Sequence, residues 1–165
     1  MARTRHVAVK SIGQTVAGQI GEHIAAAAIL QQGWGVAMAS QDSVDLVAWN
    51  KDTGQRLLIQ VKSAQISRNS RNKLEFQLGL GGNKRLPTRY DFDIMVLVSS
   101  EQRACYFLPV TSIKQKKMNR SIAFFENQEL EADSWQKAIE ELYYESTQQK
   151  TLRNYRHRSR TSSDG

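Results

Sequence analysis

The chain has 165 residues, of which 40% are hydrophobic, and a formal net charge of +7 at neutral pH. This length suits one domain and excludes two comfortable ones, while the positive charge suits nucleic acid, an anionic membrane surface or plain solubility. The N-terminus lacks the apolar stretch of a signal peptide, and the most apolar run, residues 24–30, is too short to cross a bilayer. The single cysteine, Cys105, cannot form an intrachain disulfide, so we expect a cytoplasmic protein without a membrane partner.

Residues 12–32 predict the first helix, because this segment is rich in alanine, lacks proline and is followed by Gly33 and Gly35. One apolar stripe runs through Val16 and Ile20, and a second stripe lies on the opposite side of the helix. A helix that is apolar nearly all round is usually buried between layers, and we expect that position here.

Short apolar runs rich in β-branched residues follow the helix and predict strands separated by polar turns. The runs cover residues 34–39, 44–49, 57–61, 74–78, 93–99 and 104–110, with 121–125 as a candidate for one more strand. A glycine-containing turn separates 44–49 from 56–63, which is the pattern of an antiparallel hairpin.

Residues 133–144 predict a second helix, with apolar residues at helical spacing and Asp133 or Ser134 as the N-cap. From about residue 148 onwards the chain loses its apolar residues and becomes rich in arginine. We therefore expect one α/β (α+β) domain over residues 1–147, followed over 148–165 by a basic tail that can be disordered on its own.

Polar residues interrupt or close two of the apolar strands. Asp45 lies inside the run 44–49, and Lys62 closes the next strand two places after Gln60. Strand side chains alternate between faces, so Gln60 and Lys62 share a face, and Asp45 can face both if the strands pair. Taken alone, each residue has a structural explanation, such as a turn carboxylate or a solvated strand end. Together they suggest a site, because a buried charge needs a partner or a metal.

The same residues suit the cleavage of a phosphodiester. A hard cation such as Mg²⁺ prefers oxygen ligands, which the Asp45 carboxylate, the Gln60 side-chain carbonyl and the Val61 main-chain carbonyl could supply. Such a metal lowers the pKa of a bound water and stabilises charge on the phosphate. Lys62 would orient or help activate that water and hold the phosphate, and Glu22 could bind a second metal or its water from the helix.

Gly21-Glu22 on an alanine-rich helix, then Val44-Asp45-Leu46-Val47, then Gln60-Val61-Lys62, together resemble the PD-(D/E)XK nuclease superfamily. The resemblance covers roughly residues 13–110 and depends on order and spacing more than on any single match. Within the superfamily the chain is similar to Holliday junction resolvases and intron-encoded homing endonucleases, and residues 76–109 are most similar to the homing enzymes. The resemblance implies a restriction-endonuclease-like core, with a central mixed β-sheet flanked by helices.

The resemblance also implies a Mg²⁺-dependent endonuclease, with Mn²⁺ as a substitute, that hydrolyses double-stranded DNA through Glu22, Asp45, Gln60 and Lys62. We favour site-specific, homing-type cleavage of both strands over structure-selective Holliday junction resolution. Either activity implies a homodimer or a homotetramer. Gln60 stands where the family usually has an acid, which removes one anionic ligand and leaves open a catalytically inert DNA-binding module.

Basic residues in or beside polar loops are candidate contacts to DNA phosphates, whose binding weakens steeply with salt. They are Lys10, Arg68, Arg71, Lys73, Lys84, Arg85 and Arg89. Solvation explains any one of them, and it is their abundance that suits DNA. We interpret Asp91 and Asp93 as structural carboxylates and Cys105 as a core residue.

Overall fold

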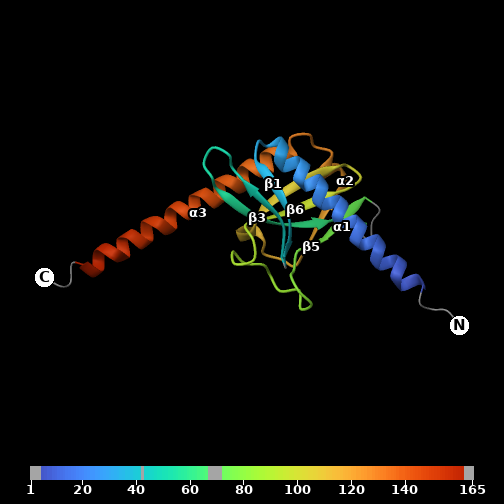
Figure 1. The fold of residues 1–165 in the computed structure, drawn as a ribbon, viewed down its shortest axis with the longest axis horizontal. Coiled ribbons are helices and arrows are strands. Elements are labelled where there is room, and N and C mark those ends of the chain that lie inside the picture. Colours follow the sequence, from blue (N-terminus) through green and yellow to red (C-terminus); the bar gives the residue numbers. More distant parts are fainter. Residues whose placement is uncertain (1–4, 42, 67–71, 162–165) are drawn as a thin grey trace.

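The computed structural model describes residues 5–41, 43–66 and 72–161, and it describes side-chain surroundings for 16–39, 43–64 and 72–148. The elements in chain order are α1 (Arg5–Gln31), β1 (Gly35–Gln41), β2 (Val44–Trp49), β3 (Arg56–Ser63), β4 (Gln65–Ile66), β5 (Lys73–Gln77), β6 (Ile94–Ser99), β7 (Ala104–Pro109), the 3₁₀ helix η1 (Val110–Ser112), β8 (Lys117–Ser121), α2 (Ile122–Phe125) and α3 (Leu130–Thr161). Figure 1 shows α1 and α3 extending from the central sheet in opposite directions, with the two termini at opposite ends of the molecule.

The larger sheet has five strands in the order β1-β2-β3-β6-β7. Strands β3 and β6 are parallel and the other neighbours are antiparallel, so the predicted mixed central sheet flanked by helices is confirmed. The predicted hairpin is also confirmed as β2 and β3. Its turn is closed by Asn50, whose Oδ1 accepts hydrogen bonds from the main-chain N–H groups of Asp52 and Thr53, and by Gly54 at a φ of 73°.

The larger sheet is covered on both faces. Helices α1 and α3 pack on one face, where Trp135 of α3 makes edge-to-face contacts with Trp34 and Phe107 at centroid distances of 5.2 and 5.0 Å. A smaller antiparallel sheet, in the order β4-β5-β8, packs with α2 on the other face. Strand β6 serves both layers, because Val96 joins the core under the helices while Met95 and Leu97 join the core under the small sheet.

The expectation that the first helix, α1, is buried on all sides was wrong. It begins at Arg5 rather than at residue 12, and beyond its end Gly33 adopts a φ of 81°, the left-handed conformation that commonly terminates helices. Ala25 and Ile29 are fully buried, but Val16 and Ile20 are each about half exposed, at 47% and 48%. The helix therefore packs with one face only. No helix within the described part of the chain is long and apolar enough to span a bilayer.

Two further expectations near the C-terminus were wrong. Residues 122–125 form the helical turn α2 rather than a strand, because the Ser121 hydroxyl accepts a hydrogen bond from Phe124 N–H at 3.2 Å and caps that turn. Helix α3 begins at Leu130, so Ser134 is not its N-cap, and the Ser134 hydroxyl instead accepts a hydrogen bond from Phe107 N–H of β7 at 3.1 Å. The helix continues to Thr161 and therefore includes most of residues 148–165, which the sequence predicts as a separate basic tail.

Candidate active site

The hairpin brings Asp45 and Gln60 together. Leu46 pairs with Ile59 in the β2–β3 register, so the preceding residue of β2, Asp45, lies opposite Gln60. Ile59 and Val61 are buried in the core beneath α1 and α3, and strand alternation therefore sends Gln60 and Lys62 to the other face. Gln60 is only 7% exposed, while Asp45 and Lys62 are partly buried.

A compact set of hydrogen bonds surrounds the Asp45 carboxylate. Its Oδ2 accepts a hydrogen bond from Val61 N–H at 2.6 Å and a second one from the side-chain amide of Gln60. The same Gln60 Nε2 also donates to the main-chain carbonyl of Val61 at 3.3 Å. The side-chain nitrogen of Gln60 thus forms hydrogen bonds with two oxygens, those of Asp45 and Val61, that the sequence predicts as metal ligands.

This donor set fits a hard cation. A half-turn of the Gln60 amide exchanges its nitrogen and oxygen, which would direct three oxygens, from Asp45, Gln60 and Val61, towards one point. Among the described residues, no three His, Cys, Asp or Glu side chains gather at one place. A metal here would consequently depend on the amide and main-chain oxygens as well as on a carboxylate.

Helix α1 brings Glu22 towards the same cluster. Gly21 is buried against β3, where an added Cβ would lie 2.0 Å from Ser63 Oγ, so the missing side chain allows a close approach of helix and strand. The Ser63 hydroxyl donates to the carbonyl of Ala17 across this contact at 3.4 Å. The pKa of Glu22 is raised, first by burial and then by the charge of Asp45, which indicates that the two carboxylates act on each other.

Burial disfavours both charges in the centre of the cluster. It raises the pKa of Asp45, although the hydrogen bond from Val61 N–H and the charge of Lys62 act in the opposite direction. It lowers the pKa of Lys62, which the charge of Asp45 opposes and that of Lys84 increases. None of the ion pairs found among the described residues includes Lys62. The ammonium group is therefore available to an external anion.

An open hollow of about 690 Å³ lies over the cluster. Ser43, Asp45, Gln60 and Lys62 line it together with residues of the turn from Gly79 to Arg85. The sequence identified Asp45, Gln60 and Lys62, but it did not place Ser43 or the turn at the site. The glycine-rich stretch 79–82 predicts a tight turn, but it does not indicate that this turn lies beside the cluster.

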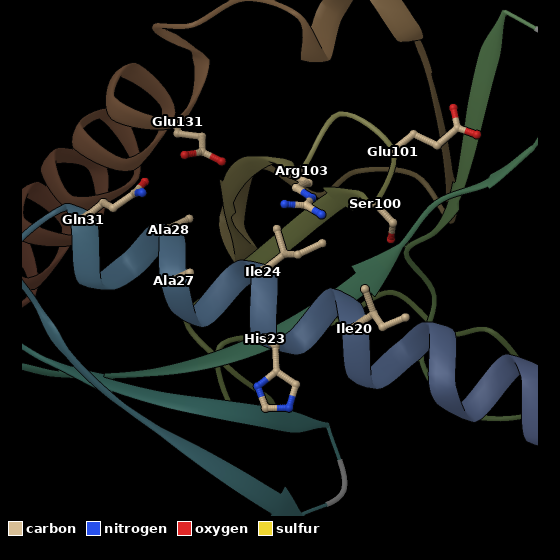
Figure 2. A pocket seen from close by; sticks show the side chains of 10 residues that line it. All are labelled: Ile20, His23, Ile24, Ala27, Ala28, Gln31, Ser100, Glu101, Arg103 and Glu131. Atoms are coloured by element: carbon tan, nitrogen blue, oxygen red, sulfur yellow. The ribbon is translucent and has the colours of Figure 1, made fainter.

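A second and somewhat larger hollow, of about 740 Å³, lies along α1, beside the β6–β7 turn and the start of α3. Figure 2 shows Ile20, Ile24 and Ala28 of α1 along it, with Arg103 and Glu131 on the other side. Neither Asp45 nor Lys62 lines this hollow. We therefore place the chemistry in the smaller hollow, where the acidic, amide and basic groups converge.

The candidate DNA contacts have different surroundings. Arg85 forms two hydrogen bonds to the Asp91 carboxylate, at 2.8 and 2.5 Å, and Arg89 pairs with Glu145. Lys84 lines the hollow, and Lys73 is exposed on β5. Three further candidates lie outside the residues whose side chains are described: Lys10, Arg68 and Arg71.

The structural interpretation of Asp91 and Asp93 is confirmed. Asp91 accepts hydrogen bonds from Arg85 and Thr88, and the bond from Arg85 holds its pKa well below the usual range. Asp93 accepts a hydrogen bond from Leu58 N–H of β3 at 2.8 Å. Cys105 is fully buried, as expected of a core residue.

Comparisons with known proteins agree with this geometry. The family model described as PD-(D/E)XK endonuclease matches residues 12–138, which is more than half of the chain. Among solved structures, the bacterial homing endonuclease I-Ssp6803I is similar, with a TM-score of 0.50 and 26% sequence identity over 65% of this chain and 74% of that one. The curated proteins include no match. The family match spans most of α1, the hairpin with Asp45, Gln60 and Lys62, and the start of α3, and the chain belongs to the PD-(D/E)XK endonuclease family.

Proposed function

We propose that this protein is a Mg²⁺-dependent endonuclease that cuts both strands of DNA at a specific site, in the manner of a homing endonuclease. The observation that supports this function best is the convergence of the Asp45 and Val61 oxygens on the side-chain amide of Gln60, beside Lys62 and under an open hollow. The net charge of +7 suits a polyanionic substrate. The similarity to a bacterial homing endonuclease favours site-specific cleavage.

The metal would be held by Asp45, Gln60 and Val61, with Mn²⁺ able to replace Mg²⁺. When bound, it supplies a lowered pKa for a bound water and positive charge near the scissile phosphate. The Gln60 amide has to turn over to present its oxygen, which also removes the hydrogen bond that Gln60 donates to Asp45 Oδ2. Glu22, whose pKa is raised in part by the charge of Asp45, would add a carboxylate for a second ion or its water.

Lys62 supplies the positive charge that does not depend on metal. Its ammonium group reaches the hollow from the end of β3 and is not held by an ion pair among the described residues. It can therefore donate hydrogen bonds to a non-bridging phosphate oxygen or to the attacking water. Burial lowers its pKa, which eases transfer of a proton from the amine.

Cleavage of both strands requires two such clusters, and each chain carries one. We therefore propose a homodimer or a homotetramer. The half-exposed residues Val16 and Ile20 and the apolar hollow along α1 offer surface for a second copy. Sedimentation should show at least a dimer on DNA, and a monomer bound to cleaved DNA would contradict this part of the proposal. The unpaired Cys105 suits the cytoplasm, which is the location we propose.

The proposed activity is tested by cleavage of a mixed substrate pool, with Mg²⁺ and with EDTA. The pool contains random-sequence duplexes, genomic fragments and labelled four-way junctions, and the cut ends are sequenced. We expect metal-dependent cuts at one long shared sequence, and we expect Lys62→Ala to abolish them. Lys51→Ala is the matched control, because Lys51 is exposed at the opposite end of the hairpin and should leave the cuts unchanged.

Other outcomes would identify other functions. Cuts confined to four-way junctions would identify a structure-selective resolvase. Binding of duplex DNA without any cut that depends on Lys62 would identify an inert DNA-binding module, in which the Gln60 amide keeps its present hydrogen bonds to Asp45 and Val61.

A further inference from the structure

A tightly built turn, residues 79–85, contributes to the lining of the hollow. Leu80 and Arg85 exchange main-chain hydrogen bonds of 2.8 and 3.0 Å, and Lys84 N–H donates to the carbonyl of Gly81 at 3.2 Å. Gly79 permits the chain to fold back, because an added Cβ would lie 2.8 Å from the carbonyl oxygen of Lys84. Leu80 is 6% exposed and belongs to the core under the small sheet. The turn therefore has a defined place beside the cluster.

The two cations of this turn differ in their surroundings. Arg85 is held by two hydrogen bonds to Asp91, and Asp91 is itself fixed by the N–H and hydroxyl groups of Thr88. These hydrogen bonds anchor the base of the turn and occupy the guanidinium group of Arg85. Lys84 is exposed, lines the hollow, and takes part in none of the ion pairs found among the described residues.

The backbone holds Lys84 in an unusual conformation. Its φ of 48° lies in the left-handed region, which non-glycine residues adopt rarely. Glycine and asparagine, which accept this conformation more readily, occupy the neighbouring positions Gly82 and Asn83. The unusual conformation therefore falls on a lysine that lines the same hollow as Lys62.

We propose that Lys84 is a second phosphate-binding residue of the active centre, which, together with Lys62, contacts the phosphate that is cut. The assignment deepens the proposed nuclease function and depends on it. Lys62 and Lys84 line the same hollow, where their two ammonium groups repel each other. A phosphate group bound by both relieves that repulsion and receives a hydrogen bond from each. Arg85 supports the turn and does not contact the phosphate.

The test compares Lys84→Gln, Lys84→Arg and the matched control Lys51→Gln in two measurements. The first is the cleavage rate at a saturating concentration of the DNA that the pool experiment identifies as the substrate. We expect Lys84→Gln to lower this rate by about 10²-fold, as for the loss of one group that stabilises transition-state charge. Lys84→Arg should restore most of the rate, and Lys51→Gln should match the native protein.

The second measurement is the salt dependence of binding to random duplex DNA in EDTA, which needs neither a metal nor a known target. Lys84→Gln should reduce the slope of log affinity against log salt by about 0.9, the value for one phosphate contact, and Lys51→Gln should not. A native rate and a native slope in Lys84→Gln would overturn the proposal, as would failure of Lys84→Arg to restore cleavage. Lys62→Ala separates the two hypotheses: if it cleaves normally the nuclease site itself is wrong, and if it is inactive while Lys84→Gln is normal, only the role of Lys84 is wrong.

Discussion

Two half-buried aspartates, Asp45 on β2 and Asp93 just before β6, flank strand β3 and look alike in isolation. Each accepts a hydrogen bond from a main-chain N–H of that strand, Asp45 from Val61 at 2.6 Å and Asp93 from Leu58 at 2.8 Å. Burial is the main cause that raises the pKa of both carboxyls. Burial and hydrogen bonding alone therefore do not indicate which of the two carboxylates belongs to the active site.

Their neighbours distinguish them. Asp93 also donates its N–H to the Leu58 carbonyl, and its own carbonyl accepts a hydrogen bond from Val110 N–H, so the residue joins β3, β6 and η1. Asp45 instead lines a hollow together with Gln60 and Lys62. A half-buried carboxylate is therefore a structural link when the main chain surrounds it. It becomes a candidate catalytic group when, as at Asp45, a side-chain amide lies beside it together with an ammonium group that forms no ion pair among the described residues.

The largest expected difference between the two residues is in cleavage. Asp45→Asn should lower the cleavage rate by on the order of 10³-fold, because it removes the one carboxylate that belongs to the central ligand set. Asp93→Asn should cleave at nearly the native rate, since its amide oxygen still accepts the hydrogen bond from Leu58. Single-turnover assays of the two variants on the same substrate give the comparison. Equal losses in both variants would show that the two aspartates cannot be separated in this way.

A smaller and opposite difference is expected in stability. Asp93→Ala leaves Leu58 N–H without its acceptor and should reduce the free energy of unfolding by about 1–3 kcal/mol. Asp93→Asn, which retains an acceptor, is the matched control and should be close to native. Urea unfolding followed by circular dichroism measures both variants. A native midpoint in Asp93→Ala would refute the structural role of this carboxylate.

The smallest expected effect is a dependence on pH. Each raised pKa means that the folded protein binds more protons than the unfolded chain between the usual and the raised value. Without metal, the free energy of unfolding should therefore fall as the pH rises through this window and then remain lower. Asp45→Asn and Asp93→Asn should each reduce that fall. Mg²⁺ should remove only the part due to Asp45, as measured by urea unfolding at several pH values, and an equal effect of Mg²⁺ on Asp45→Asn would count against the metal site.

The sequence was sufficient for the central part of the site, because strand geometry leaves little freedom there. Alternation along β3 places Gln60 and Lys62 on one face, and the short turn around Gly54 fixes the register that sets Asp45 opposite Gln60. The mixed sheet with flanking helices followed from the resemblance to a nuclease family. Local pattern and family order thus agreed on the same residues.

Other features depend on contacts between distant segments, which a local pattern does not contain. Residues 122–125 are apolar enough for a strand, but one hydroxyl, that of Ser121, turns them into a helical turn. The apolar residues on the outer side of α1 could not be distinguished from a buried face by spacing alone. Lys84 and Arg85 are adjacent in sequence and equally basic, and only the position of Asp91 after folding separates their roles.

The amide of Gln60 has a consequence for when the metal is needed. A glutamate at this position would set a second carboxylate against Asp45 in a partly buried place, and the chain would have to fold against that repulsion until a cation arrived. The glutamine donates its own hydrogen bonds to Asp45 and to the Val61 carbonyl, so the polar groups of the empty centre satisfy one another. Folding of the protein therefore does not require a divalent ion. Under the proposed function, the chain can fold completely where such ions are scarce and would acquire activity only when an ion binds.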